Sequence, residues 1–330
     1  MRQWTAANIP SQRGKLALVT GANSGLGFHI ALELARSGAS IVLACRDETR
    51  GMGAMARIRA QVPRARVFLE RLDLAELKSV ETFAENIVRR GKLDLLVNNA
   101  GILALPKRET TADGFEMQFG LNHLGHFALT GRLLPALLKA KSPRVVAVSS
   151  LAHSFGRMDF SDLQAQRFYS PWAAYAQSKL ANLLFASELQ IRADAAHLRL
   201  LSVSAHPGLS ATNIVNAGPG MAGPSLSAAL LMIGSSLLSQ SAAQGALPIL
   251  YAATSPEEKR GGGDFYGPDG IGEFWGYPQS AWLAPQARDR KAAQELWRIS
   301  EQLTGVNYRK AMKQSRGYTI STPGSAVGKA

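Results

Sequence analysis

The segment from Leu16 to Gly27 constrains the fold of this chain more than any other. An apolar run over residues 16–20 reads as a buried strand, and it is followed by glycines at positions 21, 25 and 27 and by apolar residues at helical spacing. The N–H groups that begin such a helix favour an anion, and glycines let a pyrophosphate approach the backbone. An ordinary strand-to-helix connection can carry the same glycines, but the helix that follows this turn favours nucleotide binding.

Short apolar runs and helical patterns alternate along the rest of the chain. The predicted strands cover residues 16–20, 40–44, 66–70, 93–98, 144–149 and 199–205, with a seventh near 264–266. The predicted helices cover residues 26–37, 48–61, 76–90, 115–140 and 173–193. This alternation predicts an α/β fold, namely a single-domain, Rossmann-type, doubly wound parallel sheet of about seven strands with helices on both faces.

Charge distinguishes the two ends of the chain from its body. The net charge is +13, and residues 1–15 contribute three basic residues and no acid, while residues 306–330 contribute five basic residues and no acid. We therefore divide the chain into a leader over residues 1–14, one domain over residues 15–305, and a basic tail over residues 306–330 that we expect to be disordered. The sequence has no zinc-finger spacing, recognition helix or aromatic–basic RNA motif, so we expect no nucleic-acid partner.

Residues 200–256 contain no Asp, Glu, Lys or Arg. Pro, Gly and Ser interrupt the apolar part of this stretch, so we do not expect a transmembrane segment. The stretch predicts buried helices together with a small apolar lid over about residues 209–240, which could meet a substrate, a partner subunit or a membrane surface. The single cysteine, Cys45, excludes an internal disulfide and, with a polar start that holds no secretion signal, predicts a cytoplasmic protein.

A tyrosine and a lysine stand four residues apart on one predicted helix, at Tyr175 and Lys179. A neighbouring ammonium lowers the pKa of a phenol from about 10, so the pair can act as an acid/base device in carbonyl and alcohol chemistry. Ser149 and Ser150 end a predicted strand at the edge where open α/β sheets bind ligands, and a hydroxyl there can hold a substrate oxygen. The alternatives are a surface Tyr–Lys pair and a serine that only caps a strand end.

Polar residues also follow other predicted strands at this edge. Arg46 follows the second strand, where an arginine can bind the 2′-phosphate of NADP; the alternative is a solvated arginine. Residues 98–101 (Asn-Asn-Ala-Gly) follow the fourth strand and can approach a cofactor closely, although a simple turn would have the same composition. Residues 206–208 (His-Pro-Gly) follow the sixth strand and can contact the nicotinamide end of a cofactor, with Thr212 adding a hydroxyl.

Together these segments resemble the short-chain dehydrogenase/reductase family over about residues 15–212. The family motifs Thr-Gly-x-x-x-Gly-x-Gly and Asn-Asn-Ala-Gly stand here at residues 20–27 and 98–101. The resemblance implies a catalytic tetrad of Asn122, Ser150, Tyr175 and Lys179. It implies cofactor contacts from Gly21, Asn23, Ser24, Gly25, Leu26, Gly27, Arg46, Asp73, Leu74, Asn99, Ala100, Gly101, Tyr175, Lys179, Pro207, Gly208 and Thr212.

Within that family the chain resembles the branch of retinol dehydrogenases, WW-domain oxidoreductase and protochlorophyllide reductase. The segments that carry this resemblance are residues 122–126 (NHLGH), 149–153 (SSLAH), 178–182 (SKLAN) and 206–208, with Tyr175 standing 25 positions after Ser150. We expect structural roles for His123, His126 and His153, and no metal, because no metal-ligand or acid–histidine–nucleophile spacing accompanies them.

The resemblance implies an NADP(H)-dependent oxidoreductase, with NADP(H) preferred over NAD(H). Such an enzyme transfers a hydride between the nicotinamide and the carbonyl or alcohol of a small molecule, here one expected to be apolar. Two alternatives stay open at this point: an NADP-binding sensor or regulatory protein, and a protochlorophyllide-type C=C reductase. Family members commonly dimerise, so a homodimer is also expected, and the uncharged stretch leaves peripheral membrane contact open.

Overall fold

The sheet of this protein has eight strands in the order β3-β2-β1-β4-β5-β6-β7-β8, in a computed structural model that describes residues 3–209, 240–256 and 264–316. The strands are β1 (Leu16–Thr20), β2 (Ser40–Cys45), β3 (Val67–Arg71), β4 (Leu95–Asn98), β5 (Arg144–Val148), β6 (Leu201–Ala205), β7 (Phe265–Pro268) and β8 (Pro278–Ser280). All are parallel except β8, which pairs antiparallel with β7. The predicted fold class is confirmed. The additional strand is β8, whose three residues are not an apolar run that a sequence pattern could reveal.

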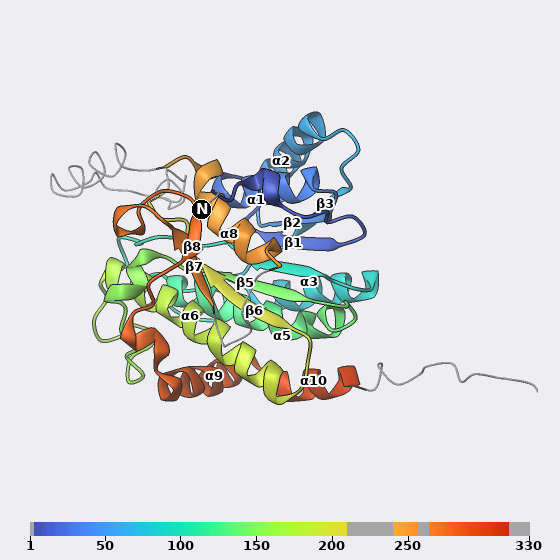
Figure 1. Ribbon diagram of the computed structural model, residues 1–330. Helices are drawn as coiled ribbons and strands as arrows, with labels where there is room; N and C mark the ends of the chain where they lie inside the picture. Colours follow the sequence, from blue (N-terminus) through green and yellow to red (C-terminus); the bar gives the residue numbers. More distant parts are fainter. Residues whose placement is uncertain (1–2, 210–239, 257–263, 317–330) are drawn as a thin grey trace, which may run out of the picture.

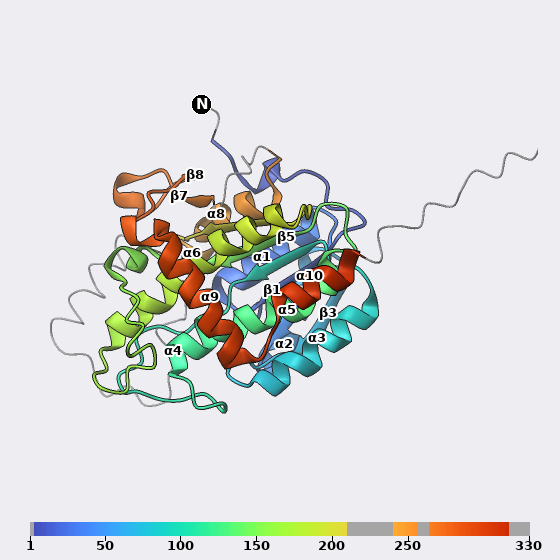
Figure 2. The same ribbon diagram turned by 90° about the horizontal axis from the view of Figure 1, so that it is seen from below.

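Helices cover both faces of the sheet, as Figures 1 and 2 show. Ala17 and Val19 of β1 lie in one core with α1 (Gly25–Arg36), α2 (Glu48–Gln61) and α8 (Ala242–Thr254). Leu18 lies in the other core with α3 (Leu77–Arg90), α5 (Gly125–Leu137) and α6 (Pro171–Ala195). Because strand side chains alternate between faces and both faces are covered, the central strands need apolar residues at nearly every position.

The helix predicted over residues 115–140 is divided. Glu116 accepts the N–H groups of Gln118 and Phe119 and so starts the short helix α4 (Met117–Phe119). A π-helical turn, η2 (Gly120–Leu124), follows and leads into α5. π-turns are rare inside α-helices and frequently occur at functional sites. The apolar pattern crosses this turn without a break, so periodicity alone does not reveal it.

The prediction of a disordered tail from residue 306 onwards is wrong for residues 308–316. After α9 (Arg290–Thr304), the chain forms α10 (Tyr308–Arg316), which packs on α5. Tyr308 is 1% exposed, and its hydroxyl donates to the carbonyl oxygen of Phe127 over 2.7 Å. The basic residues of α10 suggested a solvated tail, but they accompany apolar residues, Tyr308 and Met312, that are buried. Residues 317–330 lie outside the described residues.

The leader predicted over residues 1–14 packs against the domain in its described part. Trp4 packs edge-on against Tyr251 of α8 with ring centroids 5.3 Å apart, and a short 3-10 turn, η1 (Ala6–Asn8), follows. Gln12 is buried and donates to the carbonyl oxygen of Pro10. Residues 3–14 therefore belong to the folded body.

The apolar lid predicted over about residues 209–240 falls outside the described residues, apart from Leu209 and Gln240 at its two ends. Thr212 lies outside them as well. Within the part of the chain that the structure describes, no helix combines the length and the apolar character that a membrane crossing requires.

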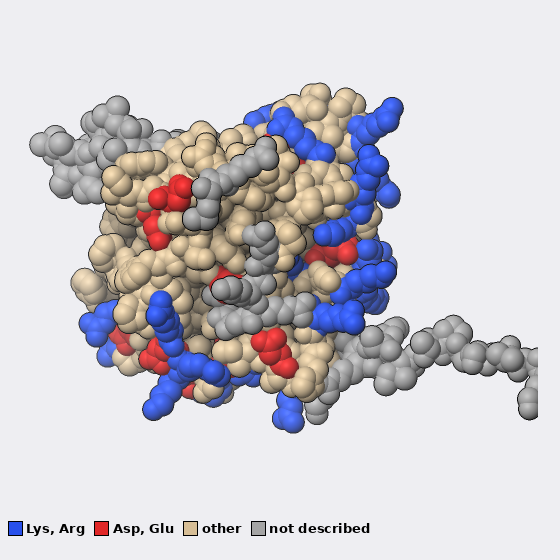
Figure 3. All heavy atoms as spheres, in the orientation of Figure 1, with Lys and Arg blue, Asp and Glu red and all other residues tan. Residues whose placement is uncertain are grey.

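Basic side chains gather at the amino-terminal edge of the sheet. In Figure 3 they line the right-hand side of the molecule, where β1, β2 and β3 begin in Figure 1. A hollow at this edge is lined by Arg13, Arg36, Arg64 and Arg66. This hollow lies at the edge opposite to the one where the predicted site residues end their strands, so it does not mark the candidate site.

The carboxyl ends of the central strands meet at one edge. Thr20 of β1 is in register with Ala44 of β2, and Asn98 of β4 is in register with Ala147 of β5. The residues that directly follow these strands are therefore brought together, which is the position of ligands in open α/β sheets.

Candidate active site

The glycine turn after β1 has the geometry that a close ligand requires. Gly21 and Gly25 have φ of +65° and +54°, a region that glycine enters without strain. A Cβ at position 27 would lie 2.4 Å from the carbonyl oxygen of Gly21, so only glycine fits there. Helix α1 begins at Gly25, and Ser24 at its N-cap makes no side-chain cap. The first N–H groups of α1 are therefore left for another partner, which can be an anion.

Asn99 lies directly beside this glycine turn. Its Nδ2 donates to the carbonyl oxygen of Thr20 over 2.8 Å, while its own N–H and that of Ala100 donate to the Thr20 hydroxyl, each over 2.9 Å. Its Oδ1 is buried and has no hydrogen-bond partner among the described residues. A buried unpaired acceptor beside a glycine cradle fits a bound polar ligand. The residues present therefore fit a dinucleotide at this edge.

The four predicted catalytic residues come together at the carboxyl edge of β4 and β5. The Ser150 hydroxyl lies close enough to the Tyr175 phenol to lower its pKa. The Nζ of Lys179, one turn later on α6, lies 5.6 Å from the Tyr175 ring centroid and donates to the carbonyl oxygen of Val148 over 3.3 Å. Tyr175 and Lys179 are 8% and 4% exposed, so both are shielded from solvent. The alternative of a surface Tyr–Lys pair is excluded.

Asn122 completes this group from the π-turn η2. Its Oδ1 accepts the N–H of Ile102 over 2.9 Å, and its Nδ2 donates to the Ile102 carbonyl over 3.0 Å and to the Ser178 hydroxyl over 2.9 Å. A Cβ at Gly101 would lie 3.3 Å from both Asn122 Oδ1 and Lys179 Nζ. Gly101 therefore lies between the amide and the ammonium and leaves space for a ligand beside them.

Burial changes the pKa values of both Tyr175 and Lys179. Burial raises the pKa of Tyr175, and the Ser150 hydroxyl, rather than Lys179, opposes this rise. Burial also lowers the pKa of Lys179 to about 8. The Nζ of Lys179 donates to the Val148 carbonyl. The expectation that the Lys179 ammonium lowers the pKa of Tyr175 stays a prediction.

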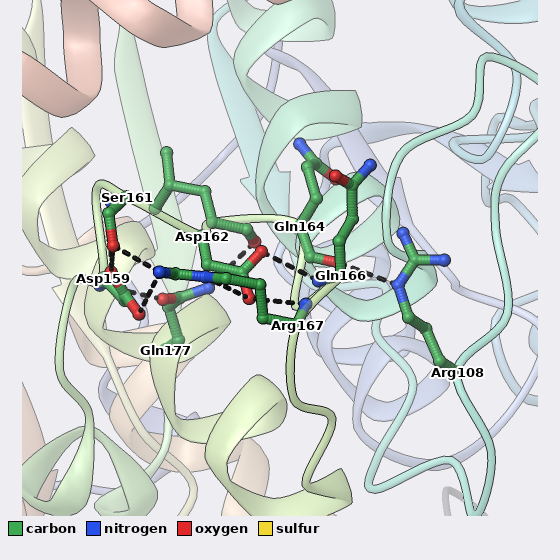
Figure 4. Close-up of polar contacts among 9 residues, drawn as sticks. Arg108, Asp159, Ser161, Asp162, Gln164, Gln166, Arg167 and Gln177 are labelled. Atoms are coloured by element: carbon green, nitrogen blue, oxygen red, sulfur yellow. Dashed lines mark hydrogen bonds and ion pairs between the residues drawn. The ribbon is translucent and has the colours of Figure 1, made fainter.

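The segment between Ser150 and α6 forms one wall beside Tyr175, and polar contacts hold it (Figure 4). Arg167 lies 3.6 Å from both Asp159 and Asp162, and Gln177 of α6 accepts the N–H of Asp159 over 3.1 Å. Arg108 donates to the carbonyl oxygen of Gln164 over 2.9 Å, which joins this wall to the segment after β4. This wall exposes Phe155 (85%) and Phe168 (79%), and Trp172 (64%) is exposed at the start of α6. The Trp172 ring packs edge-on against Tyr175 with centroids 6.3 Å apart, so it gives the surroundings of Tyr175 an apolar character.

Arg46, Asp73 and Leu74 lie where the adenosine half of a dinucleotide is expected. Arg46 is exposed directly after β2, while the neighbouring Asp47 is occupied as the N-cap of α2. Asp73 accepts the N–H of Ala75 over 2.9 Å. The carbonyl oxygen of Leu74 would lie 2.4 Å from a Cβ at Gly125, so this segment packs directly on the start of α5.

The His206–Gly208 segment is held by a contact that the sequence did not reveal. Nε2 of His206 lies 2.9 Å from Glu273, and Gly208 N–H donates to His206 Nδ1 over 3.2 Å. Gly208 has φ of +66°. Glu273 stands 67 positions from His206 with no motif of its own, so no local signal could have identified this partner. Pro207 and Gly208 thus lie at the expected edge.

Comparison with known proteins agrees with this geometry. The family model described as short chain dehydrogenase matches residues 15–219. The chain is 41% identical to human retinol dehydrogenase 13, covering 91% of this chain and 86% of that protein. It is 38% identical to mouse retinol dehydrogenase 12, covering 92% of this chain and 90% of that protein.

Solved structures show the same relation. The crystal structure of an uncharacterized protein from Mycobacterium paratuberculosis is 41% identical, with a TM-score of 0.75, covering 93% of this chain and 99% of that one. A short chain dehydrogenase/reductase from Burkholderia phymatum, solved in complex with NAD, is 25% identical with a TM-score of 0.58, covering 73% of this chain and 85% of that one. This chain belongs to the short-chain dehydrogenase/reductase family, in its retinol dehydrogenase-like branch. Membership of this branch indicates an oxidoreductase that uses a nicotinamide cofactor.

Proposed function

We propose that this protein is an NADP(H)-dependent oxidoreductase that transfers a hydride between the nicotinamide and the carbonyl or alcohol of an apolar small molecule. The observation that carries the proposal is the convergence of Ser150, Tyr175 and Lys179 beside the glycine turn. A sensor that only binds the cofactor has no use for a buried lysine next to a buried tyrosine. Burying an ionisable lysine costs free energy, which favours a catalytic task for it.

In the proposed reaction, the bound cofactor supplies or accepts the hydride. Tyr175 gives a proton to the carbonyl oxygen of the substrate, and Ser150 hydrogen-bonds the same oxygen and stabilises its developing charge. Lys179 keeps a cation next to the tyrosine and can bind the ribose hydroxyls. Asn122 holds the segment at Ile102 in place and, as we propose, a water that connects Lys179 with solvent.

The preference for NADP(H) rests on Arg46. Its side chain is exposed directly after β2, and its neighbour Asp47 is engaged in capping α2. An arginine at this position can pair with a 2′-phosphate, whereas an acid would pair with a 2′-hydroxyl. We expect Arg46→Asp to weaken NADPH binding far more than NADH binding, as measured by cofactor fluorescence titration. Equal losses for both cofactors would contradict the proposed preference.

An apolar substrate is supported by Trp172, which packs against Tyr175, and by the names of the relatives, which are retinol dehydrogenases. The direct test is NADPH oxidation by the purified chain over a panel of aldehydes, ketones, quinones and retinoids. Turnover that increases with the apolar surface of the carbonyl compound supports the proposal. Tight NADPH binding without turnover of any compound would instead favour the sensor.

A further inference from the structure

One buried imidazole connects the two halves of the candidate site. Nδ1 of His126 lies 2.9 Å from the backbone carbonyl oxygen of Asn122, and Nε2 lies 2.9 Å from the hydroxyl oxygen of Thr20. His126 is 2% exposed, so solvent scarcely competes for either nitrogen. From the sequence alone, we expect only a structural role for this histidine.

Hydrogen-bond valence fixes which nitrogen carries the proton. A carbonyl oxygen only accepts, so Nδ1 of His126 must donate. The Thr20 hydroxyl already accepts two N–H groups, from Asn99 and Ala100, which occupies both of its lone pairs. Its single proton therefore points to Nε2 of His126 at 2.9 Å, which is closer than the Val97 carbonyl at 3.4 Å. The imidazole is neutral and in the Nδ1–H form.

Both partners of this imidazole belong to the site. Thr20 directly precedes Gly21 of the glycine turn, and its hydroxyl holds the backbone at the end of β4. Asn122 lies on the π-turn η2, and its amide reaches Ile102, next to the glycine that lies between Asn122 and Lys179. A shift of η2 would therefore move the Asn122 amide relative to Lys179.

We propose that His126 is a positioning residue, which ties the strand ends beneath the cofactor crevice to the π-turn η2 and so holds the Asn122 amide beside Lys179. This role rests on the proposed function, because it concerns the same proton-transfer site. His126 itself touches neither substrate nor cofactor. It acts by fixing the position of η2 relative to the ends of β1 and β4.

The test compares two leucine variants. His126→Leu removes both hydrogen bonds, and His123→Leu is the matched control. His123 is also fully buried on η2, but its Nε2 contacts Ser300 of α9, away from the site. We expect kcat to fall about 10²-fold in His126→Leu, as for a misplaced catalytic group, while the NADPH dissociation constant changes much less. His123→Leu should lower the melting temperature and leave kcat of the folded protein near the wild-type value.

A conservative variant separates positioning from general packing. His126→Asn places an amide N–H near the position of Nδ1, so it should recover most of the kcat that the leucine variant loses. Equal kcat in His126→Leu and His123→Leu, or no recovery in His126→Asn, would overturn the proposal. A wild-type protein without any turnover would instead contradict the proposed function.

The proton position can be measured without any variant. The ¹⁵N spectrum of the wild-type imidazole should show a protonated Nδ1 and a bare Nε2 at pH 7. A proton on Nε2 would overturn the proposal, whether or not the substituted chains fold.

Discussion

The burial of Lys179 lowers the stability of this fold. The side chain is buried, and burial lowers its pKa to about 8, whereas the unfolded chain holds this proton up to about pH 10.4. The unfolded state therefore binds more protons between these pH values, so folding becomes less stable as the pH falls from 10.4 to 8. Below pH 8 the penalty is fully present. Such a penalty is typical of active sites, where function is maintained at the expense of stability.

Lys179→Met should therefore raise the melting temperature at pH 7 while it abolishes turnover. Each kcal/mol recovered corresponds to about 1.5 °C for a protein of this size. The gain over wild type should shrink at pH 10, because the wild-type lysine is then neutral as well. Lys291→Met, at an exposed position of α9, is the control and should change neither quantity. An unchanged melting temperature in Lys179→Met at pH 7 would show that the buried lysine carries no such penalty.

At the scale of elements, the π-turn η2 depends on neutral histidines. Burial lowers the pKa of His123 to about 3 and that of His126 to about 4. A histidine in the unfolded chain titrates at about 6.5. Because the unfolded state takes up these protons first, stability falls as the pH drops below 6.5 and towards 4. The turn is thus a point of acid sensitivity.

As the pH falls from 7 to 5, we expect each of these histidines to lower the free energy of unfolding by about 2 kcal/mol. His123→Gln should lack the pH-dependent loss that His123 causes. The unfolding free energy of this variant, measured with urea, should therefore depend less steeply on pH than that of the wild type. Parallel pH profiles for the two proteins would contradict buried, neutral His123.

The elements show what local sequence patterns can and cannot reveal. The glycine turn, the central strands and the Tyr175–Lys179 spacing were predictable, because backbone conformation and helical periodicity depend on neighbouring residues. The π-turn was not, since one extra residue in a turn scarcely disturbs an apolar pattern. The partners of Asn122 and His206 were not predictable either, because Ile102 and Glu273 come from distant segments without a motif.

At the scale of the whole molecule, the C-terminal helices complete the core. Tyr308 of α10 lies among Phe127, Phe185 and Trp297, with ring centroids 4.4–6.4 Å away. A Cβ at Gly131 would lie 2.7 Å from the Tyr308 ring, so α10 sits directly on α5. The count of charged residues predicted that this helix belongs to a solvated tail. Such a count does not reveal whether a basic helix also has an apolar face. The homodimer and the cytoplasmic location expected from the sequence stay predictions.

A chain that ends at residue 306 should be much less stable than one that ends at Arg316. Losing a buried aromatic side chain alone costs about 3–5 kcal/mol, and Met312 would be lost as well. Tyr308→Ala in the full chain should show most of the same loss. The melting temperatures of the two truncated chains and of Tyr308→Ala are compared by thermal unfolding. Equal melting temperatures would contradict the role of α10 in the core.

The central claim is that Tyr175 transfers the proton while a nicotinamide cofactor bound over the glycine turn exchanges the hydride. It is tested most directly by Tyr175→Phe, which removes one hydroxyl and leaves the ring in place. With a carbonyl substrate found for the wild type, we expect the rate of NADPH oxidation to fall about 10²–10⁴-fold, with NADPH affinity unchanged. A Tyr175→Phe protein that oxidises NADPH at the wild-type rate would contradict the account.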